Sequence, residues 1–106
     1  MTTVEYTDTG EMLCLKAEGH ASFAESGRDL VCAAESILAY TLVQNLIDAK
    51  EKGWLEELDA DTWDGGVLVE ATPIKRFAPR VRTIFKTILT GYRLLEKNFP
   101  ENVAIF

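Results

Sequence analysis

The segment between residues 81 and 97 carries the most regular hydrophobic pattern in the chain, and it limits the possible folds most strongly. Apolar side chains recur there at steps of three and four residues, at Val81, Ile84, Phe85, Ile88, Leu89, Tyr92 and Leu95. This spacing predicts a helix with one apolar side. Basic side chains take the outer side, at Arg82, Lys86, Arg93 and Lys97. Because such a helix needs a covering layer to be stable in water, the chain must supply one.

A second helix is predicted from Leu30 to Lys50, and it ends before Gly53. Its apolar residues also recur at helical steps, at Ala33, Ala34, Ile37, Leu38, Leu42, Leu46 and Ile47. Further apolar side chains widen this stripe, at Val31, Tyr40 and Val43. We therefore expect this helix to be buried on more than one side.

Shorter segments of alternating residues predict the covering layer. Strands are expected at 4–8, 12–18, 55–63, 67–71 and 103–106, the third less strongly because acidic residues interrupt it. Thr9-Gly10 and Asp64-Gly65-Gly66 are turn signals that predict two hairpins. The order β-β-α-β-β-α-β predicts one domain over residues 1–106. Its class is α+β, a small two-layer α/β sandwich with both helices packed on a mostly antiparallel sheet.

Composition and charge narrow the classes of function. The apolar fraction of 47% and the charged fraction of 26% are typical of a soluble globular protein. The net charge of −6 argues against direct binding of nucleic acid, which needs a basic face. It suits a basic protein partner, or it only keeps the chain soluble. No contiguous apolar run approaches the ~20 residues of a membrane span, and the first residues lack a basic signal region, so we expect a cytoplasmic protein without a membrane partner.

The two cysteines, Cys14 and Cys32, are too few for a disulfide scaffold. With one histidine, His20, at wide spacing from both, the chain lacks the pattern of a zinc site. We therefore predict neither a metal nor another cofactor.

Cys32 and His20 form the candidate reactive pair. Cys32 falls in the first turn of the first predicted helix, where free N–H groups favour negative charge, so its thiol is expected to ionise more readily than a free cysteine. A thiolate is a nucleophile, and the N–H groups, including that of Cys32, can hold the oxyanion of a tetrahedral intermediate. By themselves the two residues are weak evidence, because a lone cysteine in an alanine-rich helix is usually a core residue and a lone histidine is usually structural.

Two neighbouring polar residues have alternative interpretations. Asp29 either caps the helix by accepting N–H groups of its first turn, which its spacing favours, or orients the ring of His20. Ser36 lies four residues after Cys32 on the same side of the helix, where its hydroxyl can also bond back to a helix carbonyl.

The reactive pair lies within a longer motif. The chain reads Gly19-His20-Ala21, then five residues, then Gly27-Arg28-Asp29-Leu30-Val31-Cys32-Ala33-Ala34, one residue, and Ser36. This resembles the signature of the ribosomal-processing cysteine proteases, Prp, which is G-H-A followed by G-x-D-x-V-C-A-A-x-S. The length and the order of elements also fit that family.

The resemblance implies a Cys/His dyad, with Cys32 as nucleophile, His20 as general base and acid, and Asp29 and Ser36 in supporting positions. It implies removal of a short, basic N-terminal extension from bacterial large-subunit ribosomal protein twenty-seven, with cleavage after an aromatic residue. It further implies a homodimer and no cofactor. A substrate loop is expected to be mobile, and its residues are Gly19, Ala21, Ser22, Phe23 and Gly27.

Two features depart from the family pattern. Glu35 stands where the family usually has a small or apolar residue, and the segment 55–63 with its two flanking tryptophans is unlike other members. The alternative function is a non-catalytic ribosome- or protein-binding module that retains the fold. A thiol phosphatase is disfavoured, because it needs an arginine six residues after the cysteine and position 38 is Leu38.

Overall fold

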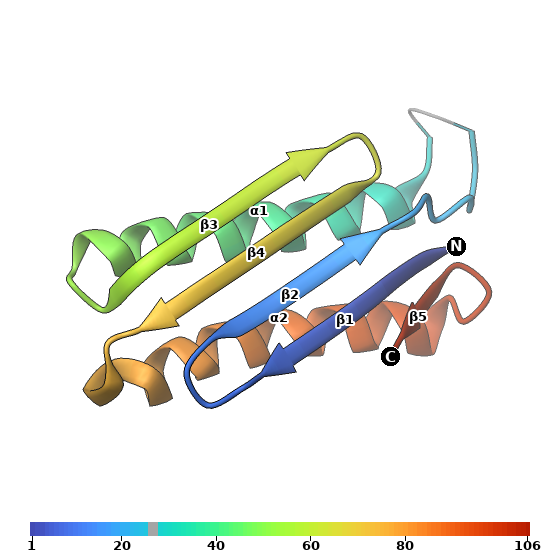
Figure 1. Ribbon diagram of the computed structural model, residues 1–106. Helices are drawn as coiled ribbons and strands as arrows, with labels where there is room; N and C mark the ends of the chain where they lie inside the picture. Colours follow the sequence, from blue (N-terminus) through green and yellow to red (C-terminus); the bar gives the residue numbers. More distant parts are fainter. Residues whose placement is uncertain (26–27) are drawn as a thin grey trace.

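The computed structural model describes residues 1–25 and 28–106, and it has the predicted order of elements (Figure 1). These elements are β1 (Thr2–Asp8), β2 (Leu13–Glu18), α1 (Leu30–Glu51), β3 (Leu55–Trp63), β4 (Gly66–Pro73), a one-turn 3-10 helix η1 (Lys75–Phe77), α2 (Ala78–Asn98) and β5 (Val103–Ile105). The α+β class is confirmed.

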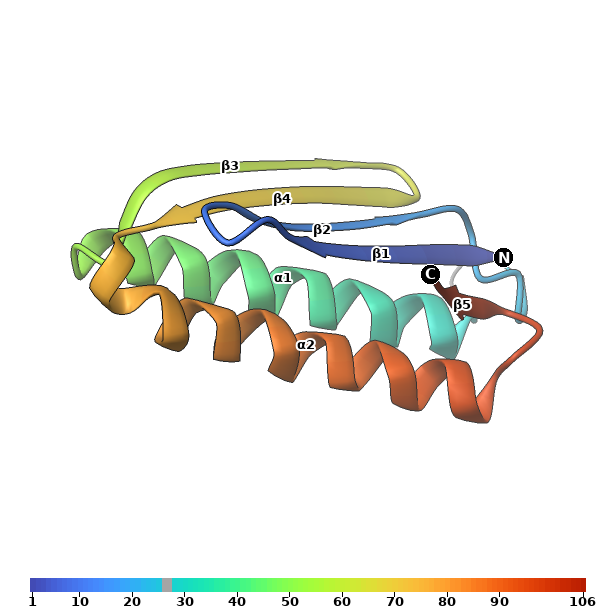
Figure 2. The same cartoon turned by 60° about the horizontal axis from the view of Figure 1, so that its bottom comes forward.

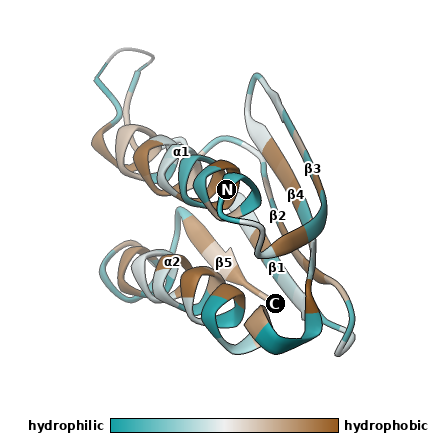
Figure 3. Cartoon of the chain, turned by 90° about the vertical axis from the view of Figure 1, so that its left-hand side faces the viewer, coloured by the Kyte–Doolittle hydropathy of each residue, from teal (hydrophilic) through white to brown (hydrophobic). Residues whose placement is uncertain are grey.

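The five strands form one sheet in the order β3-β4-β2-β1-β5. The hairpins β1–β2 and β3–β4 are antiparallel, β2 joins them by antiparallel pairing with β4, and only β5 pairs in parallel, with β1. Both helices lie side by side on the same face of this sheet (Figures 2 and 3). The prediction of two helices on a mostly antiparallel sheet is therefore confirmed.

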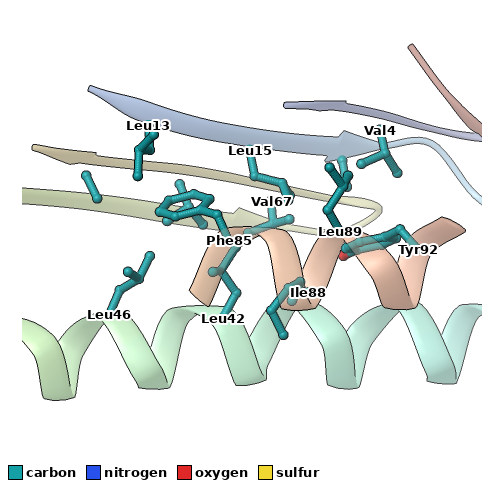
Figure 4. Packing of buried hydrophobic residues seen from close by; sticks show 14 of the residues in the cluster. Val4, Leu13, Leu15, Leu42, Leu46, Val67, Phe85, Ile88, Leu89 and Tyr92 are labelled. Atoms are coloured by element: carbon teal, nitrogen blue, oxygen red, sulfur yellow. The ribbon is translucent and has the colours of Figure 1, made fainter. Parts of the chain in front are cut away.

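Side chains that alternate along the strands build the core between the layers. In β4, for example, Val67, Val69 and Ala71 are buried while the residues between them are not. The inner side chains of β2 follow the same alternation, and Phe85 and Tyr92 of α2 fill the space beneath the sheet (Figure 4). Both aromatic side chains are almost fully buried.

The first helix differs from its prediction. One side of α1 is buried, through Val31, Glu35, Ala39, Leu42, Leu46 and Ala49. Its opposite side leaves Ile37 62% and Tyr40 61% exposed, so burial on more than one side is wrong for the single chain. By its length and apolar composition alone, α1 could cross a bilayer. The search for contiguous apolar residues did not find this helix, because polar residues interrupt the segment. The core helices of soluble proteins can have the same length and apolar composition.

The layered core predicts which leucines matter for stability. Leu42 is fully buried, so Leu42→Ala should lower the free energy of unfolding by about 2–5 kcal/mol through lost contacts and a residual cavity. Leu94→Ala on α2 is the matched control, because Leu94 is 56% exposed and its truncation should change stability by less than about 0.5 kcal/mol. Urea denaturation of both variants measures the difference, and equal costs would contradict the described packing.

Candidate active site

A cavity of about 400 Å³ lies where the first half of α1 faces the end of β2 and the turn between β3 and β4. Its wall includes four residues predicted from the sequence, Gly19, His20, Cys32 and Ser36. The end of β2 and the β3–β4 turn meet at the same end of the sheet, because Glu18 pairs with Gly66 (Figure 1). Residues that are far apart in the chain thus converge on one hollow.

Cys32 occupies the first turn of α1, as predicted, but its backbone N–H is already used. That N–H donates to Oδ1 of Asp29 at 2.8 Å. In this conformation the Cys32 N–H is therefore not available to an oxyanion, contrary to the expectation from helix position alone. An oxyanion must be held by other donors, or the Asp29 cap must yield when substrate binds.

The thiol of Cys32 also differs from its predicted ionisation. Burial raises its pKa above the ordinary value, and the carboxylates of Asp29, Glu35 and Asp64 raise it further. The expected easier ionisation is not met in the free protein, because burial and nearby negative charge oppose the N-terminal end of the helix. Cys32 therefore rests as a thiol and needs a base to remove its proton.

His20 is exposed, and its ring lies against the β3–β4 turn. A Cβ atom on Gly65 would come within 2.9 Å of His20 Nε2, so glycine at this position leaves room for the imidazole. The turn is tied to the end of β2 by the bond from Gly19 N–H to the Gly65 carbonyl, at 2.8 Å. Gly19 itself has φ +106° and faces the Met1 carbonyl, so its glycine is required by the backbone.

The cavity wall also contains residues that sequence reasoning did not assign to the site, namely Trp63, Asp64 and Gly65. The Asp-Gly-Gly signal predicted their turn correctly. It could not indicate that this turn lies next to the end of β2, because that proximity comes from the pairing of β2 with β4. The pair nearest the turn, Glu18 and Gly66, is almost fifty positions apart in the chain. Cys14, by contrast, is absent from the cavity wall, and it lies on β2 between side chains that face the helices.

Asp29 is the N-cap of α1, and the cap interpretation of its role is confirmed. Its Oδ1 accepts from Cys32, while Oδ2 accepts the N–H groups of Phe23 at 3.0 Å and Ala24 at 3.4 Å. The carboxylate thus fixes both the start of the helix and the loop before it. Although burial alone would raise the pKa of Asp29, these N–H bonds hold it below its ordinary value.

The loop predicted to contact substrate is only partly at the cavity. Of its described residues, Gly19 lines the cavity, whereas Ala21 is buried in the core and its carbonyl accepts from Asn102 Nδ2 at 2.9 Å. Phe23 packs edge-to-face on Phe99 with ring centroids 5.3 Å apart. Ser22 lies away from the cavity wall with φ +56°. Gly27 lies outside the described residues, and mobility of the loop stays a prediction.

Glu35, the departure from the family signature, points inward from α1 and lines the cavity. Only 9% of the residue is exposed. Its Oε2 accepts from Thr2 Oγ1 at 2.9 Å, while its buried Oε1 has no hydrogen-bond partner among the described residues. Burial raises the pKa of this carboxyl, and the bond from Thr2 opposes that rise. A carboxyl group therefore stands beside the reactive pair.

The described residues contain no group of three or more His, Cys, Asp or Glu side chains placed to hold a metal ion. The chemistry that the cavity offers is that of a thiol, an imidazole and a carboxyl group in a partly apolar hollow. Ser36 adds a hydroxyl one turn after Cys32.

Comparison with known proteins agrees with this geometry. A family model described as cysteine protease Prp matches residues 1–104. The ribosomal processing cysteine protease Prp of Staphylococcus aureus (strain Mu50 / ATCC 700699) is 26% identical, with 99% of this chain and 97% of the relative covered. Its namesake from Mycoplasma genitalium is 30% identical, with 86% and 84% covered. The crystal structure of Prp from S. aureus with a covalently linked product peptide superposes with a TM-score of 0.74 at 25% identity, covering 99% of this chain and 97% of that one.

The contacts of Asp29 predict how its variants behave. Asp29→Ala removes all three bonds and should cost about 1 kcal/mol of unfolding free energy at pH 7, whereas Asp29→Asn keeps an acceptor for Cys32 and should cost less. Because folding lowers the pKa of Asp29, its stabilisation is present above the unfolded pKa of ~3.9 and is lost as pH falls through the folded value. The cost of Asp29→Ala should therefore shrink as the pH falls below the unfolded pKa of ~3.9 and through the lower folded value.

Urea denaturation at pH 7 and pH 2.5 measures these costs, with proteolytic activity followed in parallel. A variant Asp29→Asn that keeps its stability but loses its activity would contradict the capping role and support orientation of His20.

Proposed function

This chain belongs to the Prp family of cysteine proteases, and on that premise we propose that it removes the short N-terminal extension of bacterial large-subunit ribosomal protein twenty-seven. It is a cysteine-type peptidase. One observation carries the proposal of a dyad: the only histidine and one of the two cysteines line the same cavity, although they are twelve positions apart in the chain.

In the proposed reaction the Cys32 sulfur attacks the carbonyl carbon of the scissile bond while His20 takes the thiol proton. The raised pKa of Cys32 supports proton transfer during the attack, since the resting group is a thiol. His20 then gives the proton to the leaving amine as the C–N bond breaks. A water molecule, deprotonated by His20, then attacks the thioester carbon. The C–S bond breaks, the extension leaves with a new C-terminal carboxyl group, and His20 returns the proton to sulfur, which restores the thiol.

The cavity wall supports an aromatic residue before the cut. Tyr40, Trp63 and Val67 supply apolar surface, and the volume of about 400 Å³ accommodates a large side chain. Acidic residues lie along β3, at Glu56, Glu57, Asp59 and Asp61, and Asp64 follows in the turn that lines the cavity. They suit a basic extension, and their attraction should weaken with salt.

A non-catalytic binding module is the alternative function. Such a module has no need for a thiol and an imidazole in one hollow, whereas a protease needs both. The convergence of Cys32 and His20 therefore favours the enzyme.

The dyad is tested on the full-length ribosomal protein with its extension. Cys32→Ala should abolish cleavage, and His20→Ala should lower kcat by about 10²–10⁴-fold, because no other histidine can serve as base. Cys14→Ala is the matched control, since Cys14 does not line the cavity, and it should cleave at the normal rate. Mass spectrometry of the product reads the mass lost from the N-terminus. Normal cleavage by His20→Ala would exclude the proposed mechanism.

We also propose a cytoplasmic homodimer, supported by the uncovered apolar side of α1. Ile37 and Ile47 are exposed there, at 62% and 40%, and a second copy placed by a twofold axis would cover them. Ile37→Glu should therefore give a monomer by sedimentation equilibrium. Leu94→Glu on α2 is the control, because Leu94 is exposed outside this side, and it should leave the dimer intact. Equal masses for the wild type and Ile37→Glu would contradict this interface.

A further inference from the structure

The basic residues of the chain are concentrated in one segment. Residues 75–97 hold seven of the 11 Lys and Arg residues but only one of the 17 Asp and Glu residues. The net charge of −6 therefore describes neither part of the molecule: a basic α2 is joined to a strongly acidic remainder. The expectation that the chain does not bind nucleic acid rested on the net value alone.

Three of these cations share one side of α2. Lys86 and Arg93 are two helical turns apart, and Lys97 follows one turn later, so the three form a row ~16 Å long. The described residues form only two ion pairs, Lys16 with Glu18 and Arg82 with Asp8. None of the three cations in the row is thus paired with a carboxylate.

A hollow of about 280 Å³ lies beside this row, between β1 and α2. Its wall consists of Tyr6, Lys86, Leu89, Thr90 and Arg93. The hydroxyl of Tyr6 is buried and has no hydrogen-bond partner among the described residues. Burial raises the pKa of Tyr6, and Asp8 adds to the rise, so the hydroxyl keeps its proton and is a donor. Two cations thus line one space, and the ring of Tyr6 forms part of its wall.

The nearby carboxylates are already bound to other groups. Asp8 accepts from Arg82 Nε at 2.6 Å and from the Gly10 N–H at 2.8 Å. Glu96, the only acidic residue of α2, accepts from the Ile105 N–H at 2.7 Å. These bonds leave the hollow and the row with an excess of positive charge and of donors.

We propose that Lys86, Arg93 and Lys97 bind the phosphate groups of a nucleic acid backbone. A row of cations matches a polymer that carries a charge at each unit, and the hollow beside Lys86 and Arg93 gives room for a phosphate group. These side chains would contact the nucleic acid backbone and not its bases, so we expect little preference for base sequence.

The observations favour nucleic acid over an anionic membrane. A helix that lies on a bilayer inserts an apolar side opposite its charged side, whereas the apolar side of α2 is buried against the sheet and Leu94 is its one large exposed apolar residue. The hollow beside the row shares no lining residue with the cavity that contains Cys32.

The proposal is tested by fluorescence anisotropy with a labelled single-stranded RNA of twelve nucleotides and mixed sequence, titrated with the full chain from 50 to 200 mM salt. We expect a Kd in the micromolar range at 50 mM salt and a slope of log affinity against log salt near −2, from ~0.7 per phosphate contacted. Lys86→Gln/Arg93→Gln should weaken binding at least tenfold and bring the slope to about −0.7.

Lys16→Gln/Lys52→Gln is the control, because it removes the same charge from residues outside α2 and should change affinity less than twofold. Cleavage of a substrate peptide by all variants at the normal rate shows that they are folded, and Lys97→Gln repeats the test on a single exposed residue. No binding of RNA at 50 mM salt, or an equal loss in both double variants, would overturn the proposal. Binding of phosphatidylserine vesicles without binding of RNA would also overturn it, in favour of a membrane.

Discussion

The pairing of β2 with β4 is the contact on which the rest of the structure depends. It joins two hairpins, neither of which would be more than marginally stable alone in water, into one sheet whose inner face is continuous enough for two helices to cover. It also sets Glu18 opposite Gly66, which carries the chain end of β2 to the β3–β4 turn. His20 follows that end, and the ring therefore rests on a turn that is distant in sequence. The fold and the reactive pair are consequences of one register.

Local patterns predicted the elements well because helix and strand periods are local properties. The repeat from Val81 to Leu95 led directly to α2, and the motif around Cys32 led to the cavity. Burial of α1 was predicted wrongly, since an apolar helix surface shows that something must cover it without showing whether that is the same chain. The contribution of Trp63 and Gly65 to the cavity was missed, because it depends on a long-range register that no local pattern reports.

The environment of Cys32 shows two local effects in opposition. The start of a helix favours a thiolate, but the cap that begins this helix is a carboxylate, and Glu35 and Asp64 add two more. In the free protein burial and these charges prevail, so the nucleophile is held in its less reactive form. A basic substrate that enters the cavity brings positive charge close to all three carboxylates. The substrate can therefore contribute to the ionisation of the group that attacks it.

The acidic strand β3 has a further consequence for how copies of the chain meet. It is nine residues long and lies at the edge of the sheet, with one row of backbone N–H and C=O groups that no neighbouring strand satisfies. Such an edge is a template for strand addition and for aggregation. Its carboxylates make two copies repel each other edge to edge, and the irregular register at Leu55 and Glu57 further disfavours self-pairing. The same edge does not repel a cationic extended chain. The free edge of β3 therefore disfavours pairing with β3 of another copy but permits pairing with a basic polypeptide.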